Sequence, residues 1–247
     1  ELMQLFSIGL VELNLDGTVK KDATGAPIPT YNQDIIEGFA RVFTGWKWDC
    51  PSTVTTCTFA NTRVQVAPAS GYNQVKPMRL YAEQHETGTK RVLSYTGATL
   101  ANATIPAGQS GDKDLADALD NIFNHPNVGP FVAKQLIQKL VTSNPSPAYV
   151  QRVAEKFNND GSGVRGNLAA VVRQVLLDTE ARSAPSGTAV ATAGKIKEPL
   201  LRLTQFWRAY DGKSNGTGSV VKYGAAVNFP GGVSAVFGEG PGQSPSV

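Results

Sequence analysis

The chain has 247 residues, of which 41% are hydrophobic and 17% charged, and its formal net charge is +3. This is enough apolar material for one or two globular domains, and the small charge creates no field that would attract nucleic acid or a membrane surface. No apolar run reaches the roughly 18 residues that a membrane-spanning helix needs, so membrane-spanning, collagen-like and coiled-coil classes are excluded. A charged fraction below the usual value of about 25% favours an extracytoplasmic protein.

Both ends of the chain look interrupted. Apolar residues at helical spacing start at Leu2 with no cap residue before them. Residues 211–247 are rich in Gly, Ser and Pro and stop without a closing element. We therefore expect a fragment or a processed form of a longer protein.

The first part of the chain predicts two helices separated by a hairpin. Apolar spacing predicts a helix over residues 1–13. Asp16 and the glycine after it predict a turn within an inserted hairpin over 14–30. Residues 30–33 fit a capping box, which predicts that the next helix starts there and ends near Gly45.

The middle of the chain predicts little regular structure. Residues 46–75 are irregular, and residues 96–111 predict a loop rich in Gly, Ala and Thr. Residues 76–85 alternate apolar and polar side chains, which predicts a short strand with one polar face. On such a strand, Glu83 and His85 would lie on the same face.

The second half predicts a series of helices, each with an apolar stripe on one side. They are expected at residues 112–124, 127–142, 147–157, 165–181 and 195–210. Ser146 is the expected cap of the third of these, because a proline follows it at the first helical position.

The predicted fold class is therefore mainly α, with a small β-hairpin and loop decoration. We expect a single helical domain over residues 1–211, with insertions at 14–30 and 46–111. A Gly-, Pro- and Ser-rich segment over 212–247 would follow it.

The two cysteines, Cys50 and Cys57, lie in the irregular segment. A disulfide between them would close a loop of about 8 residues and stabilise the fold by roughly 2.5 kcal/mol. In an exported protein the disulfide is favoured, while two free thiols and half of a metal site stay open as alternatives. We predict no metal, because the chain has 2 His and no second cysteine pair for a zinc site. No cofactor is predicted either.

The densest polar cluster lies at residues 83–90. Glu83 could orient the imidazole of His85, which would then act as an acid, a base or a metal ligand. Glu86 belongs to the same cluster, and the glycine at position 88 would let Lys90 fold back toward it. The structural alternative is a salt-bridged loop that anchors the hairpin to the helices.

His125 and Lys197 each allow two interpretations. His125 precedes a proline, where a helix ends, so it could cap carbonyl groups or join His85 in a site. Lys197 opens the last predicted helix, where the helix dipole disfavours a cation. It would therefore pair with a carboxylate such as Glu37 or Glu86, or bind an anionic ligand.

Trp46 and Trp48 precede the cysteine loop. On an extended strand they share a face and could form a stacking platform for sugar rings. The alternative is packing in the core or under a loop, which is the more common fate of such large rings.

Several motifs of known chemistry are absent from the sequence. Residues 158–163 are similar to part of a calcium loop but lack its alternating acids and its terminal Glu, so they predict a turn. The chain has no P-loop, no GxSxG elbow and no HExxH motif. The usual nucleophile and metalloprotease routes are therefore unsupported.

Six segments together resemble one bacterial family. Residues 1–9 read ELMQLFSIG and resemble its ELMELFTLG, and residues 34–46 resemble its DV..AR..TGW. Residues 85–90 are similar to HD.G.K, with Glu86 where the family has Asp. Residues 125–136 are similar to HP..A.F...KL, and residues 195–199 are similar to K.K.P. Residues 242–247 are similar to the start of GQ...PPSVFNFF. The chain is thus similar over nearly its whole length to the family called domain of unknown function 1800.

The resemblance implies a secreted or periplasmic bacterial protein, with further chain before residue 1 and after Val247. It also implies a protein partner similar to sulfatases and phosphatases, since such proteins are often encoded beside this family. It does not imply an established activity.

Two hypotheses for function follow. The first is an exported protein with a binding or assembly role, whose partner is a protein or a glycan. The alternative is a glycosidase-like hydrolase acting on polysaccharide, in which two carboxyl groups would face a cleft about 5–9.5 Å apart. The candidate catalytic residues are Glu37, Glu83, His85, Glu86, His125 and Lys197. The candidate substrate-binding residues are Trp46, Trp48 and Lys90.

Overall fold

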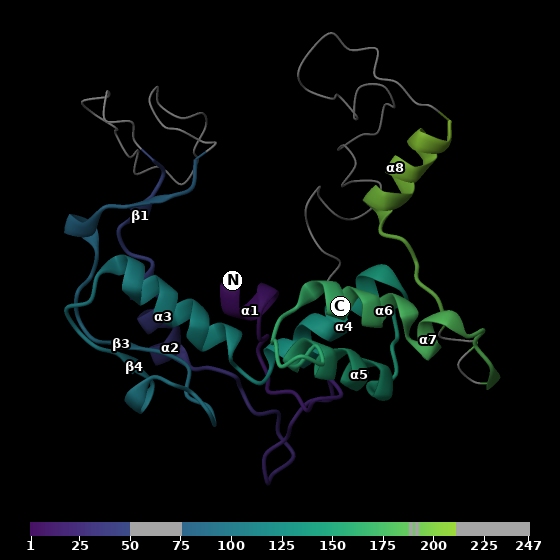
Figure 1. Cartoon of the computed structure of the whole chain (residues 1–247), viewed down its shortest axis with the longest axis horizontal. Coiled ribbons are helices and arrows are strands. Elements are labelled where there is room, and N and C mark those ends of the chain that lie inside the picture. The colour runs from purple at the N-terminus through teal and green to yellow at the C-terminus, as the bar shows by residue number, and fades with distance from the viewer. Residues whose placement is uncertain (50–75, 188–189, 191–192, 211–247) are drawn as a thin grey trace. The chain divides into compact units, whose positions relative to one another are not determined.

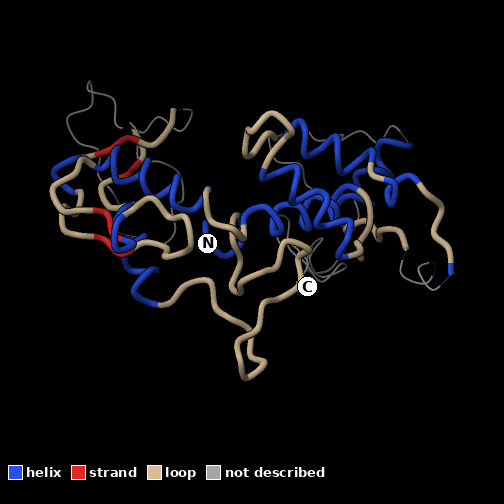
Figure 2. The backbone as a smooth tube through the Cα atoms, turned by 60° about the horizontal axis from the view of Figure 1, so that its bottom comes forward, coloured by secondary structure: helices blue, strands red, loops and turns tan. Residues whose placement is uncertain are grey.

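The computed structural model describes residues 1–49, 76–187, 190 and 193–210. The chain divides into two compact units, Glu1–Ser186 and Gly187–Val247. Helices dominate the described part, and the strands pair only in short two-residue ladders, drawn red in Figure 2. The predicted mainly α class is confirmed.

The first helix is much shorter than the predicted helix over 1–13. Helix α1 spans only Leu2–Phe6. The backbone N–H groups of Ile8 and Gly9 both donate to the carbonyl of Met3, which closes the helix. Gly9 then has φ +72°, a left-handed conformation that favours glycine and cannot continue the helix.

The predicted hairpin over 14–30 is present as a loop held by single bridges. Val11 pairs with Pro29, Leu13 with Val19 and Lys21 with Pro27, all antiparallel. Each of two turns is fixed by an aspartate, since Asp16 accepts from the N–H of Thr18 and Asp22 accepts from the N–H of Thr24. The turn expected at Asp16 is therefore confirmed, although no continuous strand forms.

Helix α2 spans Gln33–Val42 and contributes Phe39 and Val42 to the core. Its cap is Asn32, whose side chain accepts from the N–H of Ile35, so the predicted capping box starting at Thr30 is wrong. The Thr30 hydroxyl instead donates to the carbonyl of Gly9.

The strand predicted over 76–85 is mostly wrong. Strand β1 (Trp46–Lys47) pairs antiparallel with β2 (Arg79–Leu80), and the chain then turns into a 3₁₀ helix, η1 (Ala82–Gln84). Because of this turn, Glu83 and His85 do not share the face of an extended strand.

A second small sheet forms, and one of its two strands lies in the segment 96–111, where the sequence predicts only a loop. Strand β3 (Lys90–Arg91) pairs antiparallel with β4 (Thr104–Ile105), which follows the 3₁₀ turn η2 (Ala101–Ala103). Strand β3 crosses α2 closely at Gly38, where an added Cβ would lie 1.8 Å from the Arg91 carbonyl oxygen.

Among its described residues, the first unit is completed by five helices, which Figure 1 shows in teal and green. They are α3 (Gly111–Phe123), α4 (Val128–Leu140), α5 (Pro147–Asn158), α6 (Leu168–Leu177) and α7 (Thr179–Arg182). The predicted cap at Ser146 is confirmed. The single helix predicted over 165–181 is wrong, because Asp178 leaves the helical conformation and its side chain caps α7.

One apolar cluster holds the first unit together. Helices α4, α5 and α6 pack on one another, while α2 and α3 pack with the β3–β4 sheet. The fully buried members include Ile8, Val42, Val92, Leu93, Ile105, Ile137, Val150, Val153, Val171 and Val175. Two buried amides tie loops to this core: Asn121 bonds both backbone groups of Leu93, and Asn127 bonds the carbonyls of Ile8 and Val11.

In the second unit, α8 spans Pro199–Ala209, drawn yellow-green in Figure 1. The helix predicted over 195–210 therefore starts four residues late, because Pro199 occupies its first turn. Lys197 lies before the helix and not inside it. None of the side chains of α8 is buried. Among the described residues, no helix is both long and apolar enough to cross a membrane.

Candidate functional site

Three ionisable side chains meet inside the first unit, and we call His85, Lys90 and Asp114 the buried triad. The Lys90 Nζ lies 2.6 Å from Asp114 Oδ2, and the His85 Nε2 lies 3.0 Å from the same oxygen. The three side chains are 2%, 1% and 0% exposed, respectively. The triad is thus a closed ionic cluster rather than a surface pair.

Three elements and two glycines bring the triad together. His85 ends η1, Lys90 lies on β3, and Asp114 lies in the first turn of α3, where the helix dipole favours a negative charge. Gly45, at φ +80°, and Gly111 allow the close approach, since a Cβ on Gly111 would lie 3.1 Å from the His85 Nδ1.

Hydrogen bonds fix the chemical form of the triad. The second ring nitrogen of His85, Nδ1, lies 2.9 Å from the Thr44 carbonyl oxygen, which can only accept. Burial by itself would raise the pKa of Asp114, but hydrogen bonds from Lys90, His85 and Gln109 outweigh burial and lower that pKa. Asp114 is therefore a carboxylate, and both ring nitrogens of His85 face acceptors.

Gln109 completes the shell around Asp114. Its amide nitrogen donates to Asp114 Oδ1 at 3.0 Å and to Asp117 Oδ2 at 3.1 Å. The Lys90 ammonium also donates to the Gly88 carbonyl at 3.0 Å. As placed, the triad cannot touch a dissolved substrate, so its first consequence is to tie η1, β3 and α3 together.

Glu86 lies beside the triad but outside it. One carboxylate oxygen accepts from the N–H of Gly88, and the other lies 3.4 Å from the Arg41 Nε. Both side chains of the Arg41–Glu86 pair are about half exposed, at 51% and 42%. Glu86 is the candidate acid that remains accessible near the triad.

The other two candidate carboxylates stand apart on the surface. Glu37 lies on α2, exposed, and accepts from the side chain of Gln33. Glu83 lies exposed in η1. Within the described residues, no hydrogen bond or ion pair joins Glu37, Glu83 and Glu86 to one another.

His125 is buried in a second polar cluster, away from the triad. Its Nδ1 accepts from the N–H of Asn127, and its ring meets the edge of Tyr95 with centroids 4.9 Å apart. Burial lowers the pKa of His125 to about 4, so the ring is neutral near pH 7. Among the described residues, no contact joins His125 to His85. The prediction that both belong to one site is therefore unsupported.

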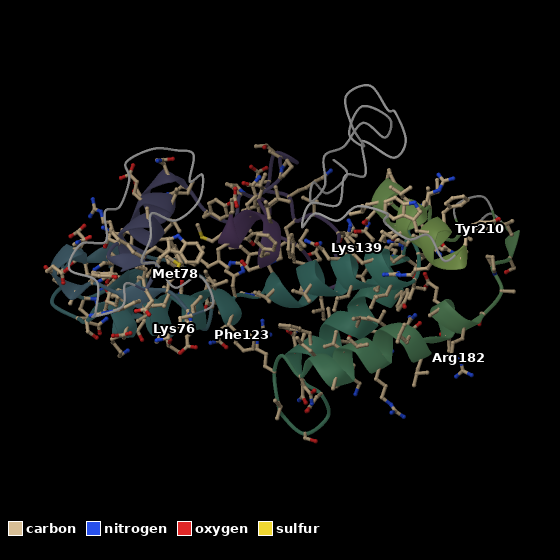
Figure 3. All side chains as sticks on the ribbon, turned by 90° about the horizontal axis from the view of Figure 1, so that it is seen from above. Lys76, Met78, Phe123, Lys139, Arg182 and Tyr210 are labelled. Atoms are coloured by element: carbon tan, nitrogen blue, oxygen red, sulfur yellow. The ribbon has the colours of Figure 1, made fainter. Side chains whose placement is uncertain are left out.

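Arg165 closes this second cluster. Its guanidinium donates to the carbonyls of Phe123 and His125 and lies 5.6 Å and 5.0 Å from the ring centroids of Phe123 and Phe157. The cation thus serves the packing of α3 against α5, which is a structural role. Phe123 is labelled in Figure 3.

The two candidate tryptophans belong to the β1–β2 ribbon. Trp46 is half-buried, and its indole nitrogen is buried with no hydrogen-bond partner among the described residues. Trp48 is 38% exposed, and its carbonyl accepts from the Tyr81 hydroxyl. The neighbouring Met78, labelled in Figure 3, is 50% exposed. The ribbon therefore offers one accessible indole, not a pair.

Lys197 belongs to an open hollow in the second unit, which we call the α8 hollow. The hollow has a volume of about 620 Å³. Its lining includes Lys195, Lys197, Arg202, Gln205, Phe206 and Tyr210. The Lys197 Nζ donates to Gln205 Oε1 at 2.5 Å, and Phe206 and Tyr210 lie with ring centroids 4.7 Å apart. Lys197 therefore sits among cations and aromatic rings.

Two predictions concern the cysteines and a metal site. Cys50 and Cys57 lie outside the described residues, so their disulfide stays a prediction. Across the ranges that the structure describes, no group of three or more His, Cys, Asp or Glu side chains is placed to hold a metal ion.

Sequence reasoning missed Asp114 and Gln109. A signal for Asp114 exists, because Ser110 is a good helix cap and an acid in the following turn is favoured. That signal indicates a helix start and not the partners of the carboxylate. The approach of His85 and Lys90 depends on the turn at η1 and on the β3–β4 pairing.

The arrangement defines a mainly α domain in which buried ionic and amide clusters join helices to short strands. A model described as "Protein of unknown function (DUF1800)" matches residues 1–236, and the chain belongs to this family. No curated protein and no solved structure matches the chain.

Proposed function

We propose that this is an exported binding protein and that the α8 hollow takes an acidic glycan. The observation that carries the proposal is the composition of the hollow. Three cations, Lys195, Lys197 and Arg202, line it beside two exposed aromatic rings, and none of the lining residues that the structure describes carries a carboxylate.

The charge of the hollow favours an anionic ligand. Lys195 lies 4.0 Å from Glu198, which offsets one cation. The guanidinium of Arg202 has no ion-pair partner among the described residues. A guanidinium binds a carboxylate through two parallel hydrogen bonds, so Arg202 is suited to the uronate groups of an acidic polysaccharide.

The aromatic rings favour a sugar over a simple anion. Phe206 is 58% exposed and Tyr210 is 74% exposed, so both rings of the hollow are accessible to a ligand. The C–H face of a pyranose is apolar and packs on an aromatic ring, while its carboxylate reaches outward. The aromatic rings of the hollow match the apolar face of a uronic acid, and the neighbouring cations match its carboxylate.

The polysaccharide hydrolase hypothesis has less support. A glycosidase needs two carboxyl groups that face one cleft at a defined separation. Glu37 is engaged with Gln33 and Glu86 with Arg41, while His85 is enclosed in the buried triad. In these contacts, no two of the candidate carboxylates face a common cleft. A binding role therefore accounts better for the same residues.

The proposed export and the proposed assembly partner rest on the family resemblance and the low charged fraction. A protein similar to sulfatases or phosphatases, bound to this chain at the cell surface, could process the glycan that the α8 hollow holds. Fractionation of cells that produce the full-length protein tests the location. Recovery only from the cytoplasm would contradict export.

The ligand proposal is tested by binding of the whole chain to polygalacturonate in affinity electrophoresis. Methyl-esterified polygalacturonate is the matched neutral ligand, because it keeps the sugar ring and removes the charge. We expect retardation by the acidic polymer alone, and about tenfold weaker binding for Arg202→Ala, which removes one charged hydrogen-bonding group.

Arg208→Ala is the matched control variant. Arg208 is exposed on the same helix but does not line the hollow, so this variant changes the net charge equally. Equal weakening by both variants would indicate a nonspecific charge effect. Equal binding of the esterified polymer, or stronger binding of poly-L-glutamate, would also refute the acidic glycan.

A further inference from the structure

The buried triad holds an amine and a carboxylate at reacting distance. The Lys90 Nζ lies 2.6 Å from Asp114 Oδ2, so the carboxyl carbon is at most one C–O bond further away. The Lys90 Nζ also donates to the Gly88 carbonyl, which holds the amine in place. Productive reactions between oriented groups start from such contacts.

The two oxygens of Asp114 have different partners. Oδ1 accepts from the Gln109 amide at 3.0 Å, whereas Oδ2 contacts both the Lys90 Nζ and the His85 Nε2. An amide N–H at Oδ1 would stabilise negative charge that develops there during attack on the carbon. Two N–H donors at Oδ2 are placed to make that oxygen leave as water.

We propose that Lys90 and Asp114 condense into an intramolecular isopeptide bond, with His85 as the group that transfers the proton. No dissolved substrate is involved, so the burial that prevents a conventional active site is no obstacle. The inference is independent of the α8 hollow and of the proposed glycan.

The step balances without any further reactant. A proton passes from the Lys90 ammonium to Asp114 Oδ2, and the neutral amine attacks the carboxyl carbon. The imidazolium of His85 donates a proton to Oδ2, the C–Oδ2 bond breaks, and Oδ2 leaves as water. The new amide nitrogen returns a proton to His85. One ammonium and one carboxylate become one amide and one water, so the net charge is unchanged.

The surroundings favour condensation. Two charges buried at 1% and 0% exposure carry a large desolvation cost, which the neutral amide does not carry. Val92 and Leu93, which follow Lys90 closely in the chain, and Ile105, which pairs with Lys90 in the β3–β4 sheet, are all buried. The bond would join β3 covalently to α3.

The test is the intact mass of the whole purified chain, fresh and after prolonged incubation. We expect a loss equal to one water molecule, which persists in denaturant. After trypsin digestion, cleavage behind Lys90 should be lost, and fragmentation should show one branched peptide that contains both Lys90 and Asp114.

Three controls locate the bond. Loss of water at Asp16 or at Asp160, each of which precedes a glycine, would give the same intact mass, so the branched peptide decides the position. Asp114→Ala should keep its full mass and regain cleavage behind Lys90, a result that does not require a stable fold. His85→Gln keeps a donor near Oδ2 but cannot relay a proton, so refolded protein should form the bond at least tenfold more slowly.

The opposite results overturn the proposal. An unchanged mass of folded wild-type protein after incubation would leave only a buried ion pair. A loss of water located elsewhere in the chain would also refute it. An equal rate in His85→Gln would remove the proposed role of His85 in proton transfer.

Discussion

The buried triad and the α8 hollow use the same kinds of cation in opposite ways. Lys90 is 1% exposed, and both contacts of its ammonium lie within the fold. Arg202 is exposed and lines an open hollow beside aromatic rings. The difference teaches that burial decides the role: a cation enclosed with its carboxylate joins elements, whereas a cation facing solvent is available to a ligand.

The largest effect should come from breaking the triad. Asp114→Ala leaves the Lys90 cation buried without its counter-ion, so the free energy of unfolding should fall by about 3–5 kcal/mol relative to wild-type protein that has kept its full mass. Urea unfolding measures this change. Asp120→Ala, in the same helix, removes an exposed carboxylate that has no ion pair among the described residues and should cost less than about 1 kcal/mol. Similar losses in both variants would mean that the triad has no special role.

The second effect is the pH dependence of stability. It tests the contribution of His125, the buried histidine that does not belong to the triad. The pKa of His125 falls from 6.5 to about 4 on folding, so the unfolded chain binds more protons between these values. Stability should therefore be complete above pH 6.5 and decline on acidification, by up to about 3 kcal/mol as pH approaches 4. The charges that act on His125 are Glu12, Lys20 and Arg165.

His125→Asn isolates this contribution, because its side-chain oxygen keeps an acceptor for the N–H of Asn127. Thermal unfolding of both proteins across this pH range should show a shallower decline for the variant. Parallel curves would assign the acid sensitivity to other groups. Asp114 contributes at lower pH, since its lowered pKa means that stability is lost only as pH falls below its unfolded value.

The third effect asks whether the β1–β2 ribbon contributes to glycan binding by itself. Trp48→Ala should weaken glycan binding by about fivefold if the exposed indole stacks on a sugar. Phe6→Ala is the control, since Phe6 is a more exposed ring, at 70%, on α1. Unchanged affinity in Trp48→Ala would restrict glycan binding to the hollow.

The smallest effect should be the change in protein stability when the α8 hollow loses one of its cations. Arg202→Ala removes no ion pair among the described residues, so the free energy of unfolding should change by less than about 0.5 kcal/mol. The same urea titration used for Asp114→Ala measures it. A loss as large as that of the triad variant would show that Arg202 serves the fold and not a ligand.

Local patterns determined the helices well where the signal lay in neighbouring residues. Ser146 followed by proline specified the start of α5, and apolar spacing located α3 and α4 within a residue or two. The same reasoning failed over 76–85, where alternation predicted a strand. There the chain turns into η1, because His85 is drawn inward by Thr44 and Asp114.

The sequence by itself determined the mainly α class, the family motifs and the polar character of residues 83–90. Only the tertiary structure decided which of those polar residues are enclosed and which face solvent. The physical reason is that the charge partner of Lys90 lies on another element, Asp114 in α3, and the two meet only in the folded chain, where β3 also pairs with β4. The periodicity of one segment indicates which of its side chains share a face. The chemistry of a site depends on which residues of other elements contact that face.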